Sequence, residues 1–163
     1  MLFRSKTDGA AAIDTLARKL ERVLQDPNFA AIAFPGDAPP KKRILFHDLQ
    51  SDARVQAHVH EGGKSGPPHS HGASWAIYGS ARGFTDMTEW RRLNPETEEH
   101  AELAVASRYR LGEGEAHAYP PHRIHSTAHP GRALVIRVIG TDLDAIPRYR
   151  FRPQRDKIVD FAE

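Results

Sequence analysis

The sequence contains no cysteine among its 163 residues. This absence excludes disulfide bonds, thiolate metal sites, cysteine-ligated iron–sulfur clusters and a cysteine nucleophile. Long apolar runs are absent as well, since none approaches the roughly 20 residues that span a bilayer. The first residues, Met-Leu-Phe-Arg, reach a charge before any signal-peptide stretch can form. We therefore expect a cytoplasmic protein with no membrane partner.

The chain also lacks a large excess of either charge, with 23 Lys and Arg against 21 Asp and Glu. Basic residues cluster only at 41–43 and at the alternating Arg148, Arg150 and Arg152. Neither cluster lies in a recognisable nucleic-acid-binding motif, so we expect no nucleic-acid partner. The unusual count is histidine, with ten residues. Histidine directs attention to metal chemistry because imidazole is the commonest metal ligand in proteins.

The length predicts a single domain, and its beginning has a helical pattern. Apolar side chains recur three and four residues apart over 9–24, which predicts an amphipathic helix with Asp8 as its N-cap and Pro27 beyond its end. Residues 28–40 contain proline and glycine, and we expect them to connect this helix to the rest of the chain.

From residue 43 onward the pattern changes to short strand-like runs separated by turn residues. No helical pattern lies between these runs, which favours an antiparallel sandwich or barrel over βαβ units. In the second run, alternation places Gln56, His58 and His60 on one face of the strand. The predicted strands are 43–47, 53–60, 74–79, 84–93, 101–111, 117–119 and 133–139.

A first histidine motif stands near the middle of the chain. On a strand, His69 and His71 point to the same face, so their imidazoles can converge on one ion. The pair alone is weak evidence, because His58 and His60 have the same spacing and such pairs are often surface or hydrogen-bonded groups. The surrounding glycines strengthen the case for His69 and His71. Five residues separate Gly63 from His69, and Gly83 lies 12 positions after His71.

A second motif lies about fifty residues later. Gly114 is followed by five residues and then by Pro120-x-His122-x-x-His125, with His129 a few residues beyond. The two motifs, in this order and with this internal spacing, resemble those of the cupin superfamily. The resemblance implies an all-β fold, the cupin double-stranded β-helix or jelly-roll barrel, over 41–145. We expect 1–40 to contribute an N-terminal α-helix and connector packed on the barrel, and 146–163 to form a C-terminal tail.

The departures from the cupin pattern define the expected site. Ala76 stands where the superfamily usually carries a metal-binding Glu, and 72–78 contain no acid. The site implied by the resemblance is therefore three imidazoles, from His69, His71 and His125. A triad of this kind on Fe(II) leaves open positions for substrate and O2. Zn(II) or another divalent transition metal is the alternative cofactor, since three imidazoles also serve catalytic zinc.

Within the superfamily, the segment Pro67–Gly83 is similar to the cysteine-dioxygenase-like branch, which holds Fe(II) with three imidazoles and oxidises small thiols. The resemblance makes Arg43 a candidate for binding a substrate carboxylate; the alternative is a solvated end of the basic cluster 41–43. The branch's Ser-x-His-x-Tyr stretch is absent, because Val135, Arg137 and Ile139 stand at those places. A substrate or reaction other than cysteine oxidation is therefore favoured.

Four further side chains are candidates for the pocket. Arg137 is expected either to bind an anionic group of the substrate or to pair with a carboxylate or reach solvent. His58 and His60 line the cavity if their strand face points inward, and otherwise lie on the surface. Tyr78 is the best substitute for the missing phenol of the branch.

Three functions remain open from the sequence. The first is an Fe(II) dioxygenase that acts with O2 on a small, carboxylate-bearing and possibly thiol-containing substrate. The second is a metal-dependent isomerase or hydrolase. The third is a non-catalytic cupin that binds a small ligand. A homodimer joined through sheet edges, with the tail from Arg148 packed across the interface, is a further expectation.

Overall fold

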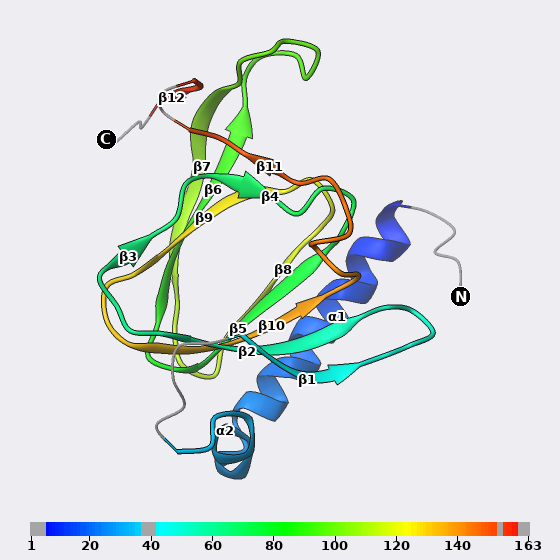
Figure 1. The fold of residues 1–163 in the computed structure, drawn as a ribbon, viewed down its shortest axis with the longest axis vertical. Coiled ribbons are helices and arrows are strands. Elements are labelled where there is room, and N and C mark those ends of the chain that lie inside the picture. The colour runs from blue at the N-terminus through cyan, green and yellow to red at the C-terminus, as the bar shows by residue number, and fades with distance from the viewer. Residues whose placement is uncertain (1–5, 37–41, 153–154, 160–163) are drawn as a thin grey trace.

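The computed structural model of the chain describes residues 6–36, 42–152 and 155–159. Two mostly antiparallel sheets curl around a common interior, and the N-terminal helix lies along the outside of the first sheet (Figure 1). In spatial order, the first sheet contains β1 (Arg43–His47), β2 (Arg54–His60), β10 (Ala133–Ile139), β5 (Ala76–Arg82) and β8 (Ala116–Tyr119). The second contains β11 (Tyr149–Arg150), β4 (His69–Ser70), β9 (Ile124–His129), β6 (Thr85–Arg92), β7 (Glu102–Leu111) and β12 (Lys157–Val159), with β3 (Lys64–Ser65) beside β9. This mostly-β barrel with an N-terminal helix is the predicted fold class.

Two helices precede the barrel. The first, α1 (Lys6–Leu24), begins earlier than predicted, so Asp8 lies inside the helix and the prediction that it is the N-cap is wrong. The second, α2 (Pro27–Ala33), replaces the first half of the predicted connector. It forms because the Asp26 side chain accepts a hydrogen bond from the backbone N–H of Asn28 (2.9 Å), while Pro27 occupies the first turn. Residues 37–40 of the connector, and Lys41, lie outside the described residues.

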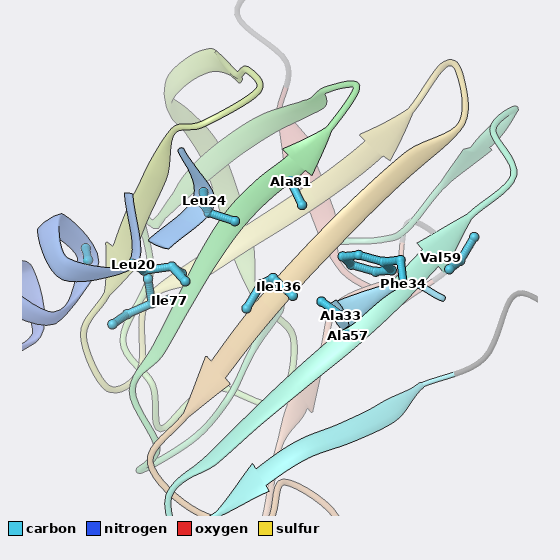
Figure 2. Close-up of a cluster of buried hydrophobic side chains, with 10 residues drawn as sticks. Leu20, Leu24, Ala33, Phe34, Ala57, Val59, Ile77, Ala81 and Ile136 are labelled. Carbon is cyan, nitrogen blue, oxygen red and sulfur yellow. The ribbon is translucent and has the colours of Figure 1, made fainter. Parts of the chain in front are cut away.

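The outer face of the first sheet is apolar and is covered by the helices. Leu20 and Leu24 of α1 pack against Ile77 and Ile136 (Figure 2). Gly79, which has no side chain, lies at the point where α1 packs on β5. A Cβ at this position would lie 2.7 Å from Cδ1 of Leu24. The glycine therefore lets the helix approach the sheet closely.

The inner face of the same sheet carries the other set of alternating residues. Val55, Ala57 and Val59 pack toward the helices, so Gln56, His58 and His60 on β2 point into the barrel. Val135 and Ile139 of β10 belong to the interior cluster, which also contains Ala76, Tyr78 and Tyr119. Two clusters thus lie on opposite faces of one sheet, and the inner one surrounds the histidine motifs.

The C-terminal segment adds strands to the barrel of its own chain. β11 pairs with β4, and β12 pairs in parallel with β7, whereas all the other strand pairs are antiparallel. The second sheet therefore continues beyond residue 145. Within the described ranges, no helix has the length and apolar character needed to cross a membrane.

Candidate metal centre

Three imidazoles converge inside the barrel. His69 on β4 and His125 on β9 are direct cross-strand partners, so their side chains lie on the same face of the sheet. His71, just after β4, completes the group, and the ring centroids lie 4.5 to 5.4 Å apart. One ring nitrogen from each residue lies within 4.8 Å of those of the other two. His71 and His125 are buried and His69 is half-buried.

Backbone carbonyls set the tautomers of two of these rings. Nδ1 of His69 lies 3.1 Å from the carbonyl oxygen of Pro67, and Nδ1 of His125 lies 3.4 Å from that of Arg123. A carbonyl oxygen only accepts, so both Nδ1 atoms carry the hydrogen and both Nε2 atoms keep a lone pair. Nε2 of His125 is fully buried and has no hydrogen-bond partner among the residues that the structure describes. A metal ion satisfies an orphaned buried acceptor of this kind.

Burial keeps the three rings neutral at physiological pH. Loss of solvation lowers the pKa of His71 to about 3 and also lowers the pKa of His69 and His125. Arg137 adds to the effect in all three, and neighbouring imidazoles add to it in His71 and His125. Neutral imidazole is the metal-binding form. The group is therefore ready to bind a cation without first losing protons.

The donor set fits a divalent transition metal. No aspartate or glutamate of the described residues joins the three histidines. Ala76, at the position of the superfamily's usual acidic ligand, is completely buried in the interior cluster. Three nitrogen donors without a carboxylate leave the ion its full charge and leave coordination positions for other ligands.

A phenol and a guanidinium lie beside the three imidazoles. The hydroxyl of Tyr78 is 3.3 Å from Nε2 of His71. The Arg137 guanidinium carbon lies 6.0 Å from the centre of the Tyr78 ring, because the two residues are cross-strand partners on β10 and β5. Arg137 donates through Nε and a terminal nitrogen to Oε1 of Gln56 (3.3 and 3.0 Å). Among the described residues no carboxylate pairs with Arg137, so its charge is available to an anion.

His58 and His60 lie inside the barrel but apart from the three-imidazole group. Nε2 of His58 contacts Oε1 of Gln56 (3.3 Å), next to Arg137. The His60 ring stacks on the His129 ring at a centroid distance of 3.7 Å. Burial lowers the pKa of His58 to about 3 and that of His60 to about 4, and Arg137 contributes to both. Of the two alternatives for this pair, the structure favours the inward one.

Arg43 does not face the imidazoles, and this prediction is corrected. Its cross-strand partner is Ala57, whose side chain packs toward the helices on the outer face of the sheet. The Arg43 guanidinium donates to the carbonyl oxygens of Ile32 (2.8 Å) and Ala33 (2.6 Å). These carbonyls end α2 without intrahelical partners and form the negative end of the helix, which attracts the cation.

Sequence reasoning missed a buried acidic residue near the site. Glu89 is the cross-strand partner of His125 on β6, and its carboxylate contacts Arg123 (3.1 Å), His117 (3.2 Å) and the hydroxyl of Tyr109 (3.2 Å). The sequence pattern that could have identified Glu89 is the alternation over 85–89, which places it on the same strand face as the buried Met87. Its charge is balanced by this network.

Comparisons with known proteins show the fold. No protein-family model matches the sequence, and no curated protein matches it. An uncharacterized double-stranded β-helix protein from Klebsiella pneumoniae matches with 12% identity over 72% of this chain and 83% of that chain, at a TM-score of 0.50. CapF, solved with the inhibitor 3-isopropenyl-tropolone, matches with 14% identity over 72% of this chain but only 33% of its own, at a TM-score of 0.54.

A cupin superfamily protein from Desulfitobacterium hafniense matches with 14% identity over 69% of this chain and 87% of that chain, at a TM-score of 0.49. Identities this low establish the fold alone. The chain thus has the double-stranded β-helix fold that the resemblance of its two histidine motifs implies. None of these three proteins bears on the cysteine-dioxygenase-like branch.

Proposed function

We propose that this cupin is a metal-dependent enzyme that oxidises a small carboxylate-bearing substrate with O2. His69, His71 and His125 would hold a single divalent ion, Fe(II) in the first place and Zn(II) as the alternative. The observation that carries the proposal is the buried, neutral three-imidazole group, in which no described residue is a hydrogen-bond partner of Nε2 of His125. When bound, Fe(II) held by three nitrogen donors supplies open positions for substrate and O2.

The surrounding side chains have separate tasks in this proposal. Arg137 binds the substrate carboxylate through the N–H groups that Gln56 leaves free, because a guanidinium recognises a carboxylate bidentately. The contact with Gln56 fixes the guanidinium in place. The hydroxyl of Tyr78, beside His71, donates a hydrogen bond to the bound substrate. The apolar interior around Val135 and Ile139 excludes water.

One observation favours a second function, non-catalytic binding of a small ligand. Val135 and Ile139 are buried and apolar where the thiol-oxidising branch has polar groups. A protein that binds an anionic ligand at Arg137 without transforming it needs neither group. The third candidate function is that of an isomerase or hydrolase, which would form product without consuming O2.

Oxygen uptake distinguishes these functions. The Fe(II)-loaded protein is mixed with small thiol and non-thiol carboxylates in an oxygen-electrode cell, beside His125→Ala and the control His100→Ala. His100 lies in an exposed loop, so its loss leaves the site intact. We expect uptake by the wild type and by His100→Ala and none by His125→Ala. Ligand binding with neither O2 uptake nor product would contradict the oxygenase and support the binding protein.

A further inference from the structure

Besides Arg137, a cluster of three arginines lies beside the three-imidazole group. A pocket of about 420 Å³ is lined by His69 and Ser70 of β4 and by the segment 146–152. Three arginines of this segment, Arg148, Arg150 and Arg152, are among its walls. The function proposed above uses none of them.

Strand register explains why the pocket adjoins the imidazoles. Arg150 on β11 is the cross-strand partner of His69, and His69 is the partner of His125 (Figure 1 shows β11 beside β4). The side chains of directly paired residues project from the same face of a sheet. The Arg150 side chain therefore leaves β11 on the face that carries the imidazoles. His69 therefore forms a wall shared by the pocket and the imidazole group.

The segment that carries the arginines is held in place independently of any ligand. The backbone N–H of Phe151 donates to the carbonyl oxygen of Pro68 (2.9 Å), and its side chain is buried against Leu103. The backbone N–H of Arg152 donates to Oδ2 of Asp156 (2.8 Å). A Cβ at Gly72 would collide with the carbonyl oxygen of Pro147, so the segment also lies directly on the turn after His71. The backbone that carries the arginines is therefore held in place by contacts within the protein.

The charge of the pocket is only partly balanced. Arg148 pairs with Asp144 (2.9 Å), an acid that also faces Lys42 (3.6 Å). In the described part of the chain, Arg150 and Arg152 have no carboxylate partner. Two positive charges therefore remain for a ligand, and a single carboxylate would neutralise only one.

We propose that this pocket binds a doubly charged oxyanion of the substrate, a phosphoryl group or a pair of carboxylates. The geometry places that group at the rim while the rest of the molecule extends past His69 toward the imidazoles. Guanidinium groups suit this task because their fixed fork matches the oxygens of phosphate and carboxylate. The inference rests on the proposed function only in treating the bound anion as part of the substrate.

Calorimetric titration of the full-length, metal-free chain tests the pocket separately from the metal. Inorganic phosphate, malonate and acetate are titrated into the wild type and the double variant Arg150→Gln/Arg152→Gln. Arg91→Gln, an exposed strand arginine outside the pocket, is the matched control. We expect the dianions to bind at least 10-fold more tightly than acetate, and the double variant to lose at least 10-fold in affinity while the control is unchanged.

Binding of either dianion by the wild type that weakens at least 10-fold in the double variant supports the proposal, and the tighter-binding dianion identifies the chemical group. No binding by the wild type, or equal affinity in the double variant, would overturn it. Displacement of the anion by a short DNA duplex at far lower concentration would also overturn it in favour of a nucleic-acid surface. Because the chain carries no metal here, failure of the metal proposal would leave these results unchanged.

Discussion

At the scale of single residues, His122 is the clearest case of local strain. It adopts a left-handed backbone conformation (φ +65°), and its backbone N–H is held by the carbonyl oxygen of Gly72 (2.8 Å). In the cupin pattern that this segment resembles, glycine is preferred at this place, and the positive φ of His122 gives the physical reason. Residues with a Cβ pay a steric cost in this region that glycine avoids.

We therefore expect His122→Gly to stabilise the protein. The gain is at most about 1 kcal/mol, because the relief of strain is offset in part by the greater entropy of glycine in the unfolded chain. The measurement is the free energy of unfolding in urea. The contrasting variant is Gly83→Ala, where φ is +70° and a Cβ would lie 2.5 Å from the carbonyl oxygen of Arg132. Loss of stability in His122→Gly would contradict this account of the turn.

Arg137 and Arg43 form a matched pair on opposite faces of one sheet. Arg137→Leu is expected to weaken binding of a carboxylate ligand by about 1.5–3 kcal/mol, the range for a lost charge-assisted hydrogen bond. Arg43→Leu is expected to leave this affinity unchanged, because Arg43 binds the end of α2. Calorimetry on both variants decides between them. A larger loss in Arg43→Leu than in Arg137→Leu would restore the original assignment.

At the scale of elements, the packing of α1 on the sheet depends on a few side chains. Leu20 is buried against β5, next to Gly79, whereas Leu16 on the same helix is 42% exposed. Leu20→Ala is expected to lower the free energy of unfolding by about 2–4 kcal/mol, and Leu16→Ala by less than about 1 kcal/mol. Chemical denaturation measures both. Equal losses would mean that α1 does not pack as described.

The elements that could be predicted from the sequence are those whose signals are local. The apolar run over 133–139 and the apolar spacing over 9–24 each follow from neighbouring residues. β10 has the predicted bounds, and α1 ends at the predicted residue but begins three residues earlier. α2 was missed because Pro27 was interpreted as the end of one helix, although Asp26-Pro27 also begins another. β4 and β11 have two residues each and exist only through pairing with distant strands.

The same distinction applies to the site. The resemblance of the two motifs to the cupin pattern implied that His69, His71 and His125 form one site, and that resemblance could be seen because each motif is a local pattern of residues. The face to which Arg43 points depends on the pairing of β1 with β2, which contains an irregularity between Ile44 and Phe46. It also depends on α2, which the sequence analysis did not contain. Orientation of this kind is set by tertiary contacts.

At the scale of the whole molecule, buried neutral histidines make stability depend on pH. The pKa of His58 is lowered to about 3, mainly by burial, against about 6.5 for an unperturbed histidine. Between these values the unfolded chain binds the proton and the folded chain does not. Stability contributed by His58 is therefore complete above about pH 6.5 and is lost as the pH falls toward 3, by at most about 1.4 kcal/mol per pH unit.

As the pH falls from 7 to about 4, we expect the free energy of unfolding to decrease less in His58→Gln than in the wild type. Urea unfolding of the metal-free protein at a series of pH values between 7 and about 4 measures it. His100→Gln, at an exposed loop residue, is the control that should follow the wild type. Parallel curves for the wild type and His58→Gln would contradict the placement of His58 inside the barrel.

The metal content of the purified protein and its variants tests whether His69, His71 and His125 bind a metal ion. The full-length protein is purified, loaded anaerobically with Fe(II) or Zn(II), passed over a desalting column and analysed by mass spectrometry for bound metal. The account predicts about one ion per chain for the wild type, His58→Ala and His60→Ala, and a sharp loss for His69→Ala, His71→Ala and His125→Ala, since each supplies one of three ligands. A wild type that retains no ion, or a metal content that depends on His58 and His60 instead, would contradict it.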